Sequence, residues 1–287
     1  MNSEETIDLL RKCRRSDIQS VSTRIGDLDN EVRWDLINKA VSLVDNDLML
    51  FMHVPKTGGT TFGETLAEDQ VAHVVSADAA LHMFLHQIFS VLNARDEKKI
   101  LVRAHHPLSL FLKIDPARVS DFFTAYRDPV DVHVSNINMI VRRFSSYLDD
   151  SGPESLNEGE REFCRGWEAS LGGVPDLSPD GALGIARSDV YLERMGSVFT
   201  KFFNVDNWRE LVLSGRLAVI DFRKFDDVFL ALFGYEAPPE RKNVSDSKVI
   251  RRSDLAGADM AKLVGVDGSI CGFLSSNLSS PASFRTF

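Results

Sequence analysis

The stretch Leu48–Phe62, LMLFMHVPKTGGTTF, constrains the fold more than any other part of the chain. It begins with an unbroken apolar run, which is typical of a strand covered on both faces, as in a parallel sheet. Pro55 ends the strand because it has no N–H to donate. The glycine pair permits backbone angles closed to other residues, and the threonine pair suits a helix start. The sequence therefore predicts a buried strand, a tight loop and the beginning of a helix.

A loop of this kind presents backbone N–H groups at a helix N-terminus, and such groups bind anions. The candidate anion-binding residues are Lys56, Thr57, Gly58, Gly59, Thr60 and Thr61. The nucleotide P-loop pattern GxxxxGK[ST] does not fit, because the lysine here precedes the glycines and the loop is shorter. An ordinary glycine-rich turn between a strand and a helix is the alternative interpretation.

A second stretch, Asp121–Ser135, reads DFFTAYRDPVDVHVS. Its aromatic-rich start predicts a strand, after which Asp128 is expected to cap a helix and Pro129 to be the first helical residue. Arg127 at the strand end and Ser135 on the helix can bind one phosphate together. Arginine offers a bidentate fork for this purpose, and serine offers a single donor.

Both stretches resemble motifs of sulfotransferases that use 3′-phosphoadenosine 5′-phosphosulfate (PAPS). HVPKTGGTT is close to the 5′-phosphosulfate loop of the carbohydrate (Golgi-type) branch and its bacterial relatives, and RDPV…S is similar to the 3′-phosphate site. Arg127 and Ser135 match the two phosphate-binding positions, whereas Val132 stands where the family often has a second arginine. The resemblance covers roughly residues 46 to 250. It implies a P-loop-like α/β/α sandwich with a central parallel sheet.

A third predicted strand, Lys99–Arg103, leads into a pair of histidines. Ligands of open α/β sheets bind beyond the carboxyl ends of the strands, so three strands direct Lys56, His105 and Arg127 toward one edge. The AHHPL sequence resembles the strand end at which sulfotransferases keep a catalytic histidine. That register implies that His105 is the base and His106 its neighbour. Two histidines in a polar loop are the alternative.

The segment Pro238–Lys248 resembles the late family loop that closes over the nucleotide. The resemblance implies nucleotide contacts from Lys242, Asn243 and Ser245, and a plain linker is the alternative.

Three parts of the chain define its expected organisation. Residues 1–45 are expected to form an N-terminal helical extension, and 46–287 the sulfotransferase domain. Within that domain, residues 145–185 are rich in Asp, Glu, Gly, Ser and Pro. This segment is interpreted as an acceptor-side insertion or lid, or as a solvated loop. Residues 186–203 are expected to be helical.

Composition narrows the functional classes. The 287 residues carry a net charge of −9, which disfavours general binding of nucleic acid. The chain has no transmembrane-length apolar run and its start does not resemble a signal peptide, while three separated cysteines are typical of reduced thiols. These features predict a cytoplasmic protein. His82 and His86 share a helix face but lack a third ligand, so no metal site is predicted.

The resemblance implies transfer of a sulfuryl group from PAPS to an acceptor hydroxyl, or to an amine, with 3′-phosphoadenosine 5′-phosphate as the second product. The acceptor is a glycan, a lipid or a small molecule, and the sequence carries no sign of which, nor of the oligomeric state. A nucleotide-dependent kinase and a non-catalytic nucleotide-binding module are the alternatives. The kinase is disfavoured because the GK[ST] signature is missing.

Overall fold

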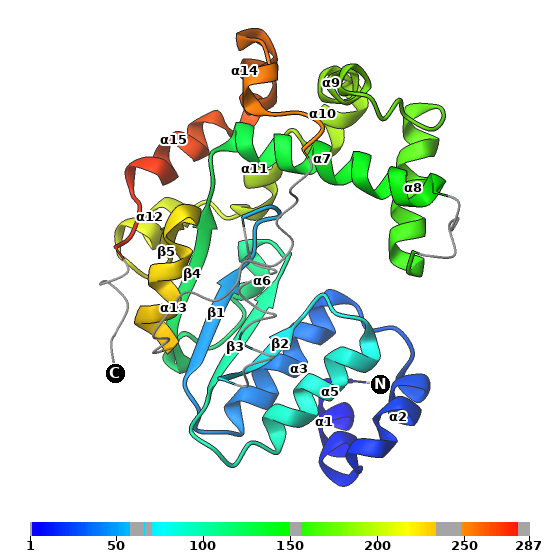
Figure 1. The fold of residues 1–287 in the computed structure, drawn as a ribbon. Coiled ribbons are helices and arrows are strands. Elements are labelled where there is room, and N and C mark those ends of the chain that lie inside the picture. Colours follow the sequence, from blue (N-terminus) through cyan, green and yellow to red (C-terminus); the bar gives the residue numbers. More distant parts are fainter. Residues whose placement is uncertain (1, 58–65, 67–70, 150–155, 234–247, 281–287) are drawn as a thin grey trace. The chain divides into compact units, whose positions relative to one another are not determined.

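The computed structural model describes residues 2–57, 66, 71–149, 156–233 and 248–280 of the chain (Figure 1). The chain divides into two compact units, which are described separately below. Unit 1 comprises Met1–Tyr126, Lys201–Asn243 and Leu274–Phe287, and unit 2 comprises Arg127–Thr200 and Val244–Phe273.

Unit 1 is built on a five-stranded sheet in the order β2-β3-β1-β4-β5, with every pair of neighbours parallel. The strands are β1 (Leu48–Met52), β2 (Ala72–Ser76), β3 (Lys99–Ala104), β4 (Val119–Tyr126) and β5 (Ala218–Asp221). All five residues of the central strand β1 are buried, as its continuous apolar run predicts. The expected α/β fold with a central parallel sheet is confirmed.

The two faces of β1 contact different layers, because side chains alternate across a strand. Met49 and Phe51 pack with residues of α13 (Phe225–Phe233). Leu50 instead lines a cavity with Phe111 of the short helix α6 (Leu108–Phe111). Helices therefore flank the sheet on both faces.

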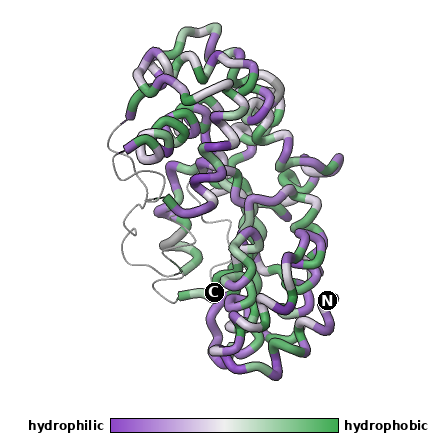
Figure 2. Tube along the Cα trace, turned by 90° about the vertical axis from the view of Figure 1, so that its right-hand side faces the viewer, coloured by the Kyte–Doolittle hydropathy of each residue, from purple (hydrophilic) through white to green (hydrophobic). Residues whose placement is uncertain are grey.

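The N-terminal helices pack against one another beside this sheet (Figure 1). They are α1 (Ser3–Lys12), α2 (Ile18–Ile25) and α3 (Asn30–Ser42), joined by α5 (Leu81–Leu92). Hydrophobic and hydrophilic positions are interspersed along the tube near the N-terminus in Figure 2, and each of these helices places apolar residues in the core. Helix α3 begins where the Asp29 carboxylate accepts the N–H of Val32. α12 (Trp208–Leu213) precedes β5.

Unit 2 is helical. Its members are α7 (Pro129–Leu148), α8 (Glu158–Leu171), α9 (Pro179–Arg187), α10 (Asp189–Met195) and α14 (Gly257–Val264). The apolar side of α7, which includes Ile137 and Phe144, packs in a core with Trp167 and Tyr191. Two further helices, α11 (Val198–Phe202) and α15 (Gly268–Ser276), lie where the chain passes between the units.

The helical stretch expected at 186–203 contains the end of α9 and the whole of α10 and α11. The Ser188 hydroxyl accepts the Tyr191 N–H and donates to the carbonyl of Ile185, so one side chain both ends α9 and starts α10. Residues 257–276, whose sequence indicates no particular structure, contain α14 and α15.

Two polar side chains tie the late segment of unit 2 to its earlier helices. Asn138 accepts the N–H groups of Val249 (2.7 Å) and Ile250 (3.1 Å). The buried Asp267 carboxylate accepts the N–H groups of Phe199 and Thr200 at 2.9 and 2.8 Å. It also accepts the Thr200 hydroxyl at 2.7 Å. These bonds satisfy buried backbone groups that would otherwise be costly.

Within the described residues, no helix combines the length and apolar character needed to span a bilayer.

Candidate functional site

The loop after β1 opens with a tight turn that holds Lys56 in an unusual conformation. The Val54 carbonyl accepts both the N–H (3.3 Å) and the hydroxyl (2.7 Å) of Thr57, with Pro55 and Lys56 between them. Lys56 has φ +66°, and it is the only non-glycine residue with positive φ in the described part of the chain. Proline second and positive φ third are the features of a type II turn, whose third position normally requires glycine. Lys56 therefore holds a strained backbone conformation in this turn.

His105 follows β3 and contacts the loop after β1. Its Nδ1 lies 2.8 Å from the carbonyl oxygen of His53, and a carbonyl only accepts, so Nδ1 carries the proton. In the neutral ring Nε2 is then an unprotonated acceptor, and within the described residues it makes no hydrogen bond. The imidazole rings of His105 and His53 also pack together, with centroids 4.0 Å apart. His105 is therefore oriented with a basic nitrogen available.

His106 has the opposite arrangement. The indole Nε1–H of Trp34 donates to its Nδ1 at 2.9 Å, and indole has no acceptor, so Nδ1 of His106 is unprotonated. Its proton therefore lies on Nε2 in the neutral form. The ring is only 8% exposed, and the single lone pair is already engaged. This arrangement suits a structural residue better than a base.

Burial keeps the histidines of this edge neutral. Burial lowers the pKa of His53 well below its usual value, and the neighbouring positive groups act in the same direction. The pKa of His105 is also lowered, first by reduced hydration and then by Arg103 and Lys56, while the Asp78 carboxylate opposes the change. His105 keeps an exposed surface although protein atoms surround much of the ring. Its imidazole is thus predominantly unprotonated at neutral pH.

Unit 2 carries the predicted phosphate-binding pair at the start of α7. Asp128 caps the helix by accepting the N–H of Val130 at 2.9 Å, and Pro129 is the first helical residue, as predicted. Arg127 directly precedes this cap and is half-buried, so desolvation lowers its pKa somewhat. Ser135 lies farther along the same helix, also half-buried.

Arg252 of unit 2 forms ion pairs at the start of this helix. Arg252 pairs with Asp128 at 2.8 Å and lies 3.4 Å from Asp131, which neutralises much of the acidic charge there.

Asn136, next to Ser135, is 1% exposed, and neither polar atom of its amide has a hydrogen-bond partner. Burial raises the pKa of the nearby Tyr191 hydroxyl and the Asn136 amide opposes that change, yet no hydrogen bond joins the two side chains. An unsatisfied buried amide is unusual and requires an explanation.

Several predicted site residues fall outside the described part of the chain. These are Gly58, Gly59, Thr60 and Thr61 of the anion loop, and Lys242, Asn243 and Ser245 of the late loop. Among the described ones, unit 1 brings the Lys56 turn and His105 to the same carboxyl edge, because His105 bonds to His53 at the start of that loop. Arg127 and Ser135 belong to unit 2.

Sequence reasoning missed His53, Asp78 and Trp34 as contributors to this edge. His53 follows the last residue of β1, so the strand-end rule applied to Lys56 applies to it as well. Trp34 carries no such signal, since it lies 72 residues before the histidine that it contacts.

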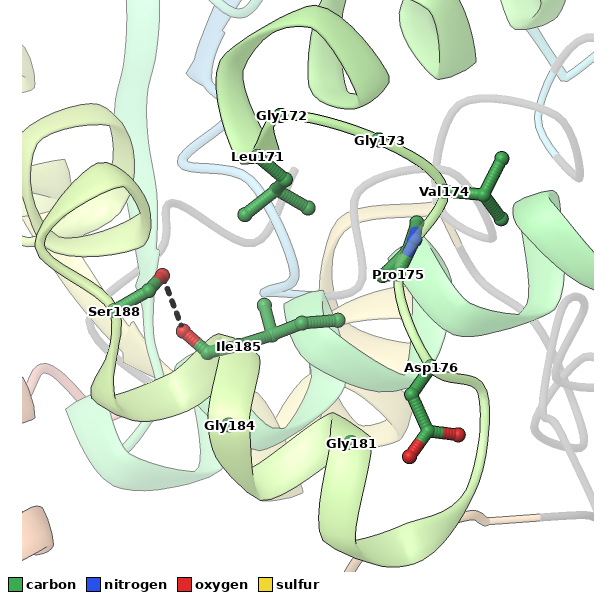
Figure 3. Close-up of a pocket in the computed structure, with 10 residues that line it drawn as sticks. All are labelled: Leu171, Gly172, Gly173, Val174, Pro175, Asp176, Gly181, Gly184, Ile185 and Ser188. Atoms are coloured by element: carbon green, nitrogen blue, oxygen red, sulfur yellow. Dashed lines mark hydrogen bonds between the residues drawn. The ribbon is translucent and has the colours of Figure 1, made fainter.

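Two hollows lie elsewhere. In unit 1, a cavity of about 510 Å³ lies where β4 and β5 begin, and none of the predicted site residues line it. In unit 2, a hollow of about 260 Å³ lies between the end of α8 and α9 (Figure 3). There the side chains of Leu171 and Ile185 point toward each other, and glycines form much of the wall (Figure 3). This hollow belongs to the segment in which the acceptor-side insertion is predicted.

A serine–histidine–aspartate row joins β2, α5 and the loop before β3. Ser90 Oγ lies 3.4 Å from His73 Nδ1, and His73 Nε2 lies 2.8 Å from the Asp96 carboxylate. Ser90 is inside α5, where neighbouring N–H groups bond to carbonyls of the helix and are not offered to an oxyanion. The row therefore links elements of unit 1 and is not assigned to catalysis.

Among the described residues, no three potential ligands gather around a metal position.

Comparison with known proteins adds no assignment: no family model, curated protein or solved structure matches the chain.

Proposed function

We propose that the protein is a PAPS-dependent sulfotransferase that transfers a sulfuryl group to an acceptor hydroxyl. The observation that carries this proposal is the pairing, at one edge of a parallel sheet, of a lysine held in a left-handed turn with a histidine whose basic nitrogen is available. The fold is then a P-loop-like α/β/α sandwich. The motif resemblance supplies the co-substrate, and the geometry supports the roles of the residues.

The reaction that this edge would catalyse is an in-line displacement. The acceptor oxygen forms a bond to sulfur while the bond from sulfur to the 5′-phosphate oxygen breaks. His105 Nε2 accepts the acceptor proton, and its Nδ1–H stays bonded to the His53 carbonyl, which stabilises the resulting imidazolium. Lys56 stabilises the negative charge that develops on the leaving phosphate. Positioning and charge stabilisation suffice for such a transfer.

The opposite tautomers of the two histidines support His105 as the base. Protonation of His106 at Nδ1 would break its bond with Trp34 and place two N–H groups face to face. Protonation of His105 at Nε2 breaks no bond within the described residues. The lowered pKa of His105 keeps it unprotonated at neutral pH, as a base requires.

The start of α7 supports binding of the 3′-phosphate. Arg127 and Ser135 offer charged and neutral donors there. Both side chains are half-buried and therefore keep part of their surface exposed to a ligand.

The kinase and the non-catalytic nucleotide-binding module remain the competing proposals. A kinase would share the anion loop, yet the loop sequence lacks the GK[ST] signature. A binding module has no need for an accessible basic nitrogen on His105. No observation favours either rival over sulfuryl transfer.

The test combines binding and turnover. Thermal-shift titrations with 3′-phosphoadenosine 5′-phosphate and with ATP are expected to give a larger stabilisation by the former. Incubation with ³⁵S-labelled PAPS and panels of glycans, lipids and small-molecule extracts is then expected to label an acceptor. His105→Ala is the inactive control and His106→Gln the matched one. Preference for ATP would favour the kinase, and tight binding of PAPS without any labelled product would favour the binding module.

A further inference from the structure

Helix α3 reaches the candidate edge through Arg33 as well as through Trp34. The Arg33 Nη1 donates to the carbonyl oxygens of Ala77 (2.9 Å) and Ala79 (2.6 Å), and its Nε donates to that of Leu28 (3.2 Å). The two carbonyls of the loop between β2 and α5 flank Asp78 on either side. One guanidinium therefore holds the backbone on both sides of Asp78.

Asp78 in turn contacts the backbone of His105. Its Oδ2 accepts the His105 N–H at 3.1 Å. The neighbouring Ala77 N–H donates to the carbonyl of Arg103 at 3.0 Å, so the loop is joined to the end of β3 at two points. These bonds make a continuous connection from α3, through the Asp78 loop, to the residue that carries the basic nitrogen.

We infer that Asp78, held by Arg33, is a positioning residue for His105: it fixes the backbone below the imidazole and supplies negative charge beside it. The inference rests on the proposed function only where turnover is concerned, because the connection itself is independent of any substrate. It also gives the N-terminal helices a role at the candidate site.

The charge of Asp78 matters because the other charged groups around His105 are positive. The groups that act on the ring are His53, Lys56, Arg103, His106 and Asp78. Removal of the carboxylate leaves Arg103 and Lys56, both positive, as the charged neighbours of the imidazolium. The His105 pKa then falls further, and the proton taken from the acceptor is held less well.

The test uses the full chain and four variants. Asp78→Asn keeps the size and an oxygen that can accept the His105 N–H, but it removes the charge. Asp78→Glu restores the charge, and Arg33→Lys keeps the charge of that residue while it removes the fork. Asp35→Asn is the matched control, since Asp35 is an exposed carboxylate on α3 with no hydrogen bond or ion pair among the described residues.

The first readout is the titration of His105 in the ligand-free protein, followed by NMR on ¹⁵N-histidine-labelled samples. The His105→Ala spectrum assigns the signal. Asp78→Asn is expected to move the midpoint to lower pH, Asp78→Glu to move it back, and Asp35→Asn to leave it in place. Equal midpoints in Asp78→Asn, Asp35→Asn and the unaltered protein would overturn the inference.

The second readout is the pH–rate profile of sulfuryl transfer. Asp78→Asn is expected to shift the ascending limb to lower pH and to lower kcat about tenfold to a hundredfold, with KM for PAPS little changed. Arg33→Lys is expected to lower kcat in the same direction through misplacement of the loop. Undiminished kcat in a folded Asp78→Asn protein would also overturn the inference.

The two proposals fail separately. If the His105 titration responds to Asp78 but no preparation transfers sulfuryl groups, the positioning role stands and the proposed function falls. If the unaltered protein turns over PAPS and the His105 titration midpoint is the same in Asp78→Asn, the function stands and the positioning role falls.

Discussion

The left-handed conformation of Lys56 allows the role of its side chain to be separated from the role of its backbone. A residue with a Cβ costs about 1–2 kcal/mol in this conformation, a penalty that glycine avoids. Glycine, in turn, adds about 0.4–1 kcal/mol of unfolded-state entropy relative to alanine. The two terms differ by about 1 kcal/mol. Lys56→Gly is therefore expected to be about 1 kcal/mol more stable than Lys56→Ala, because alanine keeps the strain.

Both variants remove the ammonium group, so both are expected to lose turnover equally. Loss of one donor to a transition state costs about 100- to 1000-fold in kcat. Lys56→Met keeps the aliphatic length and is the control for packing. Its turnover is expected to equal that of Lys56→Ala. Urea unfolding monitored by circular dichroism measures stability, and transfer from labelled PAPS measures turnover.

Two results would refute this reasoning independently. If Lys56→Gly is no more stable than Lys56→Ala, the left-handed turn is not maintained in solution. If either variant retains near-normal turnover, the lysine does not stabilise the transition state. If the Lys56→Gly protein is more stable than Lys56→Ala but inactive, the strained backbone is retained because the lysine side chain is needed.

Four further predictions concern other residues. His105→Ala is expected to lower kcat about 100- to 10,000-fold while PAPS binding survives, and His106→Ala to do less; the reverse order in a radiolabel assay would reassign the base. Because the His105 pKa is lowered below its usual value, the unaltered enzyme should lose rate only as the pH falls through that lowered value, and an ascending limb above neutrality would contradict this. Arg127→Ala should weaken 3′-phosphoadenosine 5′-phosphate by about 1.5–3 kcal/mol in calorimetry and adenosine 5′-phosphate far less, whereas equal losses would exclude a 3′ contact. Asp267→Ala should lower the free energy of unfolding by about 2–4 kcal/mol, because it leaves two N–H groups without their acceptor, and an unchanged melting curve would contradict that.

The sheet could be predicted from sequence because its strands carry local signals. The apolar run from Leu48 to Met52 has no helical period, and a proline follows it closely. The cap at Asp128 and the first helical residue Pro129 were predicted for the same reason, since each acts on its own neighbours. The order of the strands depends on pairing between distant residues, so local signals do not determine it.

The connections at the candidate edge could not be predicted, because they join residues that are distant in sequence. The pairing of Arg33 with the Ala77 and Ala79 carbonyls depends on how α3 packs beside the sheet. The left-handed φ of Lys56 could not be predicted, because the glycines after it are the residues for which unusual backbone angles are normally expected. The division of 186–203 into separate helices was signalled only by Ser188, a residue type that also occurs within helices.

The bond between Trp34 and His106 also gives the protein an intrinsic optical reporter. Indole fluorescence responds to the group that its N–H faces, and an imidazole that gains a proton becomes a quencher. Trp34 is fully buried, so bulk solvent contributes little to its emission. Acidification should therefore quench this tryptophan as His106 takes up a proton and the bond breaks. In a variant whose other two tryptophans, Trp167 and Trp208, are replaced by phenylalanine, the state of this strand end can be followed by emission without a substrate or a label.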